Sequence, residues 1–120
     1  MILVDTSVWV DHLRALDKTL AEYLDRGMVL AHPFVIGELA LGNLRRRDVV
    51  LDALQDLPQS NVASDGEILH FINRYALSGL GVGYVDVHLL AAVRLTAGTV
   101  LWTRDRRLLG VAERLGLAMP

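Results

Sequence analysis

Short apolar runs that alternate with helical segments are the feature that most constrains how this chain can fold. Ile2–Val4 is wholly apolar and ends in a polar Asp-Thr-Ser sequence, which is typical of a buried parallel strand that leads into a helix. Met28–Ala31 and Thr99–Trp102 are further runs of this kind. Parallel strands need crossover connections, and these place helices on both faces of the sheet. The sequence therefore predicts an α/β fold, a three-layer α/β/α arrangement around a central parallel sheet.

The segments between these strands carry helix signals. Pro33 suits a first helical turn, Ser64-Asp65-Gly66-Glu67 fits a capping box, and Gly27 and Gly79 are natural stops. We expect helices over residues 6–14, 17–26, 34–44, 48–55, 64–78, 86–96 and 105–115, and possible minor strands over 61–63 and 117–119. At 120 residues, with 52% apolar residues and no internal repeat or linker, the chain is expected to be one domain, 1–120.

Composition narrows the class of protein. The longest apolar stretch, residues 82–102, is interrupted by Asp86, His88 and Arg94, so it lacks the run of about 20 apolar residues that a membrane span needs. The N-terminus shows no signal-peptide pattern, so a cytoplasmic protein without a membrane partner is expected. The absence of cysteine excludes disulfides, thiolate zinc sites and a cysteine nucleophile.

Positive charge is local, because the net charge is −2. It gathers at Arg45–Arg47 and at Arg104, Arg106 and Arg107, and Lys18 is the only lysine. The arginine fork grips phosphate in a bidentate manner, so either cluster suits contact with a phosphodiester, and a solvated helix face is an equally good explanation of each.

Four acidic residues stand in apolar sequence: Asp5, Glu38, Asp86 and Asp105. Carboxylates are rarely buried unless they are paired or bind a metal ion. The three aspartates stand where each could instead cap a helix. Glu38 lies in mid-helix on the face of Phe34 and Leu41 and is expected to point inward, although a buried salt bridge with Arg45 would also explain it.

Asp5 and Asp105 follow strands and Asp86 starts a helix, so all three can meet Glu38 at one edge of the sheet. Two unit charges about 4 Å apart repel by roughly 4 kcal/mol at an effective dielectric near 20, so such a cluster needs a cation. An all-oxygen site favours Mg²⁺ or Mn²⁺, which support phosphodiester hydrolysis. The neighbouring hydroxyls of Thr6, Ser7 and Thr103 could orient a carboxylate or water, or could serve as helix caps.

Four motifs in order carry a family resemblance: Val4-Asp5-Thr6-Ser7-Val8, Gly37-Glu38-Leu39, Gly83-Tyr84-Val85-Asp86 with Leu90-Ala91-Ala92, and Thr103-Arg104-Asp105. Together they resemble the PIN-domain nucleases over essentially the whole chain. The length and the Pro33–Leu39 segment resemble the VapC toxins of bacterial toxin–antitoxin pairs. One departure is His32-Pro33, where many relatives carry a small hydroxyl residue before the glutamate-bearing helix.

The resemblance implies a metal-dependent endoribonuclease that inhibits translation or growth, is blocked by a cognate antitoxin and forms a homodimer. Its catalytic residues would be Asp5, Glu38, Asp86 and Asp105, with metal ligands Asp5, Asp86 and Asp105. Thr6, Ser7 and Thr103 would support them, and Arg104, Arg106 and Arg107 would contact RNA or antitoxin. His12, His70 and His88 lack metal-ligand spacing and are expected to be structural, whereas His32 is expected at the surface or at a strand end, with contact to substrate as the alternative.

Two other classes remain open from the residues alone. A receiver-type or phosphotransfer signalling domain shares the length and the acidic pocket but needs a lysine near that pocket, and a haloacid-dehalogenase-like phosphatase would need an aspartate where Ser7 stands. A non-catalytic RNA- or protein-binding module would use the acids only as helix caps.

Overall fold

A central parallel sheet organises the molecule, as the sequence predicts. The structure is a computed structural model that describes all 120 residues. Its elements are β1 (Ile2–Val4), α1 (Thr6–Arg14), α2 (Lys18–Asp25), β2 (Val29–Leu30), α3 (Pro33–Ala40), α4 (Arg47–Asp56), α5 (Asp65–Arg74), α6 (Tyr84–Leu95), β3 (Val100–Trp102) and α7 (Arg106–Arg114). The α/β class and its parallel sheet are therefore confirmed.

β1 is the central strand of the sheet, whose order is β2-β1-β3. Leu3 pairs with Leu30 on one side and with Leu101 on the other, and both pairings are parallel. All three residues of β1 are buried, which explains why its sequence is apolar without alternation. Beyond the strand, the amide of Asp5 still donates to the carbonyl of Trp102, so the first residue after β1 is held against β3.

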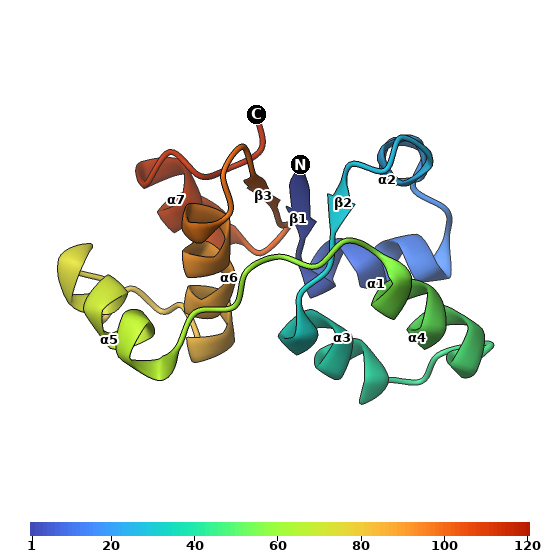
Figure 1. Cartoon of the computed structure of the whole chain (residues 1–120), viewed down its shortest axis with the longest axis horizontal. Coiled ribbons are helices and arrows are strands. Elements are labelled where there is room, and N and C mark those ends of the chain that lie inside the picture. The colour runs from blue at the N-terminus through green and yellow to red at the C-terminus, as the bar shows by residue number, and fades with distance from the viewer.

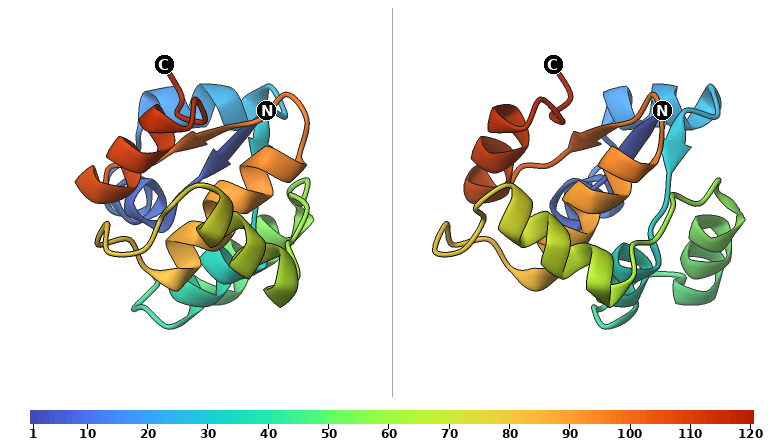
Figure 2. Two further views of the ribbon diagram at one scale, coloured as in Figure 1. Left: turned by 90° about the vertical axis from the view of Figure 1, so that its left-hand side faces the viewer. Right: turned by 60° about the vertical axis from the view of Figure 1, so that its left-hand side comes forward.

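Helices cover both faces of this sheet (Figure 1). α6 crosses one face and α5 packs outside it, whereas α1 lies on the opposite face (Figure 2). Residues 87–93 of α6 are all buried, because the helix is enclosed by the sheet and by α5. α3 and α4 lie beyond the carboxyl ends of the strands (Figure 1), where the fold leaves room for a site. No helix is long and apolar enough to cross a bilayer.

Two helices end earlier than the sequence suggests. α3 stops at Ala40 rather than near residue 44, and α5 stops at Arg74 rather than at residue 78. After α5, Ala76 adopts a left-handed conformation (φ 52°), and the amide of Leu77 donates to the carbonyl of Ile72. This Schellman turn buries Leu77, so packing ends the helix before the glycine stop.

The observed bounds of α6 and of the two minor strands also differ from those expected. α6 begins at Tyr84, two residues before the expected start at residue 86. The minor strands are reduced to single bridges, one between Ala31 and Gln59 and one between Leu101 and Ala118. The first bridge precedes the expected 61–63 strand, so that prediction is wrong in position.

His32 joins β2 to α3 and is fully buried, so the expectation of a strand-end histidine is confirmed and that of a surface one is wrong. Its Nδ1 accepts the amide of Phe34 at 3.0 Å, which is the N-cap contact that a hydroxyl residue would otherwise make. Burial, with a smaller contribution from nearby His88, lowers the pKa of His32 from 6.5 to about 4. The fold therefore holds this imidazole in its neutral form.

We predict that acid weakens the fold through His32. Because its folded pKa lies below its unfolded value, the stability it contributes is present above pH 6.5 and is lost as the pH falls toward 4, by at most about 1.4 kcal/mol per pH unit. His32→Asn keeps a cap acceptor but does not titrate. Urea unfolding between pH 7 and pH 4.5 should show a shallower pH dependence for this variant than for the wild type, and equal slopes would contradict the assignment.

Candidate active site

Four carboxylates lie near one another at the carboxyl edge of the sheet. Asp5 follows β1, Asp105 follows β3, Asp86 lies in the first turn of α6, and Glu38 lies on α3. Burial raises the pKa of Asp86, and the negative charges of Asp5, Asp105 and Glu38 raise it further, while a hydrogen bond from the Gly83 amide opposes the shift. The structure thus places the charges of the other three acids close enough to act on Asp86.

Asp5 is the most enclosed of the four, with 6% of its surface exposed. Its Oδ2 accepts hydrogen bonds from Ser7 Oγ at 2.8 Å and from Thr103 Oγ1 at 2.7 Å. Although Asp5 occupies the N-cap position of α1, its side chain makes no capping hydrogen bond. Helix capping therefore does not explain this buried aspartate.

The two hydroxyls beside Asp5 have fixed orientations. Ser7 Oγ accepts the amide of Arg104 at 3.0 Å, and Thr103 Oγ1 accepts the amide of Asp105 at 3.1 Å. A hydroxyl has a single proton to donate, so each of these is directed at the Asp5 carboxylate. Ser7 and Thr103 therefore fix one oxygen of Asp5 and tie it to the segment that carries Asp105.

Glu38 departs from the sequence prediction. It is exposed on the outer face of α3, together with Leu41, whereas Val35 and Leu39 make the buried face. It forms no salt bridge with Arg45; its Oε1 accepts a hydrogen bond from Thr6 Oγ1 at 2.8 Å. Glu38 reaches the site from the rim, and Thr6 on α1 holds it there.

Asp86 and Asp105 do act as caps. Asp86 Oδ2 accepts the amide of Gly83 at 3.0 Å, and Asp105 Oδ1 accepts the amide of Leu108 at 3.0 Å. Each cap uses only one carboxylate oxygen, so capping and metal binding do not exclude each other for these two residues.

All four acids share one pattern: one carboxylate oxygen is fixed by a hydrogen bond and the other has none. No arginine, lysine or histidine forms an ion pair with any of them. This all-oxygen donor set fits a hard divalent cation such as Mg²⁺. As the side chains are placed, no three of them stand close enough together to hold an ion, so binding would require the side chains to move toward one another.

Arg104, which was expected to contact RNA or antitoxin, instead pairs with two aspartates of the same chain. Its guanidinium donates to Asp11 at 2.6 Å and to Asp17 at 2.5 Å, and it lies 5.8 Å from the ring centroid of Trp102. It therefore anchors the segment after β3 to α1 and to the start of α2. No sequence signal indicated these partners, because 93 and 87 positions separate them from Arg104.

Arg106 and Arg107, in the first turn of α7, are exposed and make no ion pair. Arg107 lies over the loop before α6, where a Cβ on Gly81 would come within 2.9 Å of its Nη1. Gly81 also has a φ of 79°, so the loop needs glycine here for two reasons. These arginines are the free cations next to Asp105.

Comparisons with known proteins identify the family and the fold of this chain. Residues 2–114 match the sequence profile of the PIN domain. The chain is 50% identical to Ribonuclease VapC32 of Mycobacterium tuberculosis, from strains CDC 1551 / Oshkosh and H37Rv, over 119 residues that cover 99% of this chain and 96% of each relative. The fold is similar to a chain of the FitAcB crystal structure from Neisseria gonorrhoeae, with a TM-score of 0.63, 22% identity and 94% of both chains covered.

We predict that Asp86→Asn stabilises the metal-free protein near pH 7. Folding raises the pKa of Asp86, so its negative charge costs stability above that pKa, and asparagine removes the charge. The gain should vanish as the pH falls and the wild-type carboxyl becomes protonated. Urea unfolding in a chelator should reveal this difference, with Asp52→Asn on exposed α4 as the control. A variant less stable than the wild type at pH 7 would contradict the electrostatic account.

Proposed function

The chain belongs to the PIN-domain family, and on this premise we propose that it is a divalent-metal-dependent endoribonuclease, the toxin of a toxin–antitoxin pair that inhibits translation or growth. Asp5, Glu38, Asp86 and Asp105 would form its catalytic centre, with Asp5, Asp86 and Asp105 as the metal ligands. Membership of this family removes the receiver-type and phosphatase alternatives.

The observation that carries the proposal is the free oxygen on each of the four carboxylates. Helix caps or salt bridges alone would not require four unpaired acids at one sheet edge, since like charges in a partly enclosed pocket repel one another. The hydrogen bonds to the other oxygens hold each carboxylate near the site, and side-chain rotation would bring the free oxygens onto one ion.

The bound ion, Mg²⁺ or Mn²⁺, would activate a water and stabilise the charge that develops on the phosphoryl group. Hydrogen bonds within the chain position the carboxylates. Ser7 and Thr103 hold Asp5 at the buried end of the site, and Thr6 holds Glu38 at its rim. An RNA phosphate would therefore approach from the exposed side, between Glu38 and Asp105.

RNA and an antitoxin are the proposed partners, and the cytoplasm is the proposed location. Four carboxylates repel a polyanion, so its phosphates need local cations as well as the metal. Arg106 and Arg107 are free to serve this purpose for RNA, or for the acidic groups of an antitoxin. Arg104 is engaged by Asp11 and Asp17, so we assign it to positioning the segment that carries Asp105.

We propose a homodimer through an apolar patch on α3, α5 and α6. Phe34, Leu69 and Tyr84 are 36%, 61% and 50% exposed, respectively. The rings of Phe34 and Tyr84 both pack on buried His88, and the Tyr84 hydroxyl donates to Asp65, one turn before Leu69. Such a patch suits an interface between two copies.

The nuclease is tested with purified protein and bulk cellular RNA, in Mg²⁺, in Mn²⁺ and in a chelator. Metal-dependent cleavage is expected, with a loss of at least about a hundredfold in Asp5→Asn, because that change removes a metal ligand. The control Asp52→Asn should cleave like the wild type. Cleavage that persists in the chelator or in Asp5→Asn would refute the assignment, and a folded wild type that binds RNA without cutting it would favour a binding module.

The dimer is tested by sedimentation of wild type, Leu69→Glu and Val49→Glu. Val49 is similarly exposed but lies on α4, away from the patch. We expect the wild type and Val49→Glu to sediment as dimers and Leu69→Glu to sediment as a monomer. A monomeric wild type, or a dimer that tolerates Leu69→Glu, would contradict the proposed interface.

A further inference from the structure

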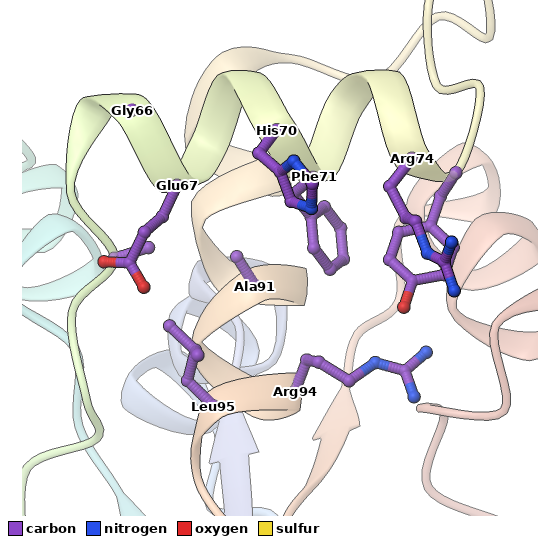
Figure 3. Close-up of a pocket in the computed structure, with 10 residues that line it drawn as sticks. Gly66, Glu67, His70, Phe71, Arg74, Ala91, Arg94 and Leu95 are labelled. Atoms are coloured by element: carbon purple, nitrogen blue, oxygen red, sulfur yellow. The ribbon is translucent and has the colours of Figure 1, made fainter.

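A cavity lies between α5 and α6 (Figure 3), and none of the four acids of the proposed active site lines it. Its volume is about 390 Å³, within the range of small-ligand sites. Phe71 and Ala91 form a buried apolar floor, and Arg74, Arg94, His70 and Glu67 supply polar groups. Nothing in the proposed nuclease chemistry uses this cavity.

The cavity and the acidic pocket lie on different faces of α6. Asp86 stands in the first turn of the helix, and Leu95, which lines the cavity, follows nine residues later. At 100° and 1.5 Å per residue, Leu95 points roughly 180° away from Asp86, and Arg94 lies about 12 Å further along the helix. A ligand in the cavity would therefore not touch the carboxylates of the proposed active site.

One end of the cavity is cationic. Neither Arg74 nor Arg94 forms an ion pair with a carboxylate. Arg94 is held in place, since its guanidinium lies 5.2 Å from the ring centroid of Tyr75 and its Nη2 donates to the carbonyl of Leu115 at 3.3 Å. One guanidinium is thus oriented in advance, which lowers the cost of binding an anion, and Arg74 lies beside it (Figure 3).

The other end carries a fixed acceptor. Glu67 Oε1 accepts the amide of Ser64 at 2.9 Å in the capping box of α5, which holds the carboxylate in place. Glu67 and Arg74 are seven residues apart, or roughly 10 Å along the helix. Phe71, His70 and Ala91 lie between these two ends (Figure 3).

We propose that this cavity binds a ribonucleotide. Its phosphate would lie between Arg74 and Arg94, its base would lie on the floor made by Phe71 and Ala91, and hydroxyl or amino groups would donate to Glu67. A terminal phosphate has three oxygens for two arginine forks, whereas a carboxylate has only two, and a flat ring suits the apolar centre. The nucleotide is either a free mononucleotide or one unit of a bound RNA.

The test uses the full chain in a chelator, so that it is independent of metal and of nuclease activity. Backbone amide NMR shifts are followed while adenosine 5′-monophosphate, adenosine or inorganic phosphate is added. We expect saturable shifts at residues 66–75 and 91–95 with the monophosphate, and binding weaker by about tenfold or more for each fragment. No saturation by about 10 mM, or shifts centred on the acidic pocket, would overturn the proposal.

Two exposed positions allow the site to be altered without disturbing the core. Arg74→Ala removes a cation that has no hydrogen bond in the structure, and Leu95→Glu adds a negative charge at a side chain that is 43% exposed. Each should weaken monophosphate binding by about tenfold, whereas Arg26→Ala, an exposed arginine on another face, should not. Unchanged affinity in both cavity variants would overturn the assignment.

Titration with a 5′-phosphorylated tetranucleotide distinguishes a site for RNA from a site for a free mononucleotide. Binding about tenfold tighter than the monophosphate, and weakened by Arg74→Ala, would assign the cavity to RNA. Equal or weaker binding would assign it to a free nucleotide. Because no metal is present, either result stands whether or not the nuclease assay succeeds.

Discussion

The hydrogen bonds that Ser7 and Thr103 donate to Asp5 join the ends of the two strands on which the site is built. Asp5 follows the central strand β1, and Thr103, 98 positions away, follows the neighbouring strand β3. A buried carboxylate without these donors would be costly, because it would lose its hydration without compensation. The same hydroxyls accept the amides of Arg104 and Asp105, so the segment leading into α7 takes its path from Asp5. The geometry of the site and the closure of the fold therefore depend on one network.

The other three acids are placed by separate local devices that have the same result. One oxygen of each acid accepts a single hydrogen bond: Asp86 from the amide of Gly83, Asp105 from the amide of Leu108, and Glu38 from the hydroxyl of Thr6. The second oxygen of each acid accepts none. Burial, and after it the repulsion by the other three acids, raises the pKa of Asp86, so its charge is unfavourable in the metal-free protein. A divalent cation would offset the repulsion, so metal binding and stability are linked. α6 connects this site to the rest of the fold, and its opposite face lines the cavity assigned to a nucleotide.

The sequence predicts the parallel sheet and the position of Asp5 and Asp105 after its strands, because apolar runs and the residues that follow them are read from neighbouring positions. It fails for Glu38, since α3 is apolar around most of its surface and its periodicity cannot distinguish a buried face from an exposed one. The burial of Leu77 ends α5 early, and the clamp of Arg104 on Asp11 and Asp17 depends on distant segments. No sequence motif predicts the cavity between α5 and α6, because its lining residues come together only when the two helices pack.

A manganese-soaked crystal, with anomalous difference maps recorded above the manganese absorption edge, tests the central claim most directly. We expect a peak about 2.2 Å from the free oxygens of Asp5 and Asp86, with Asp105 and Glu38 bound directly or through water. The peak should be absent in an Asp5→Asn crystal treated in the same way. Strong peaks only elsewhere, or an unchanged peak in the variant, would show that the four carboxylates do not form the metal centre.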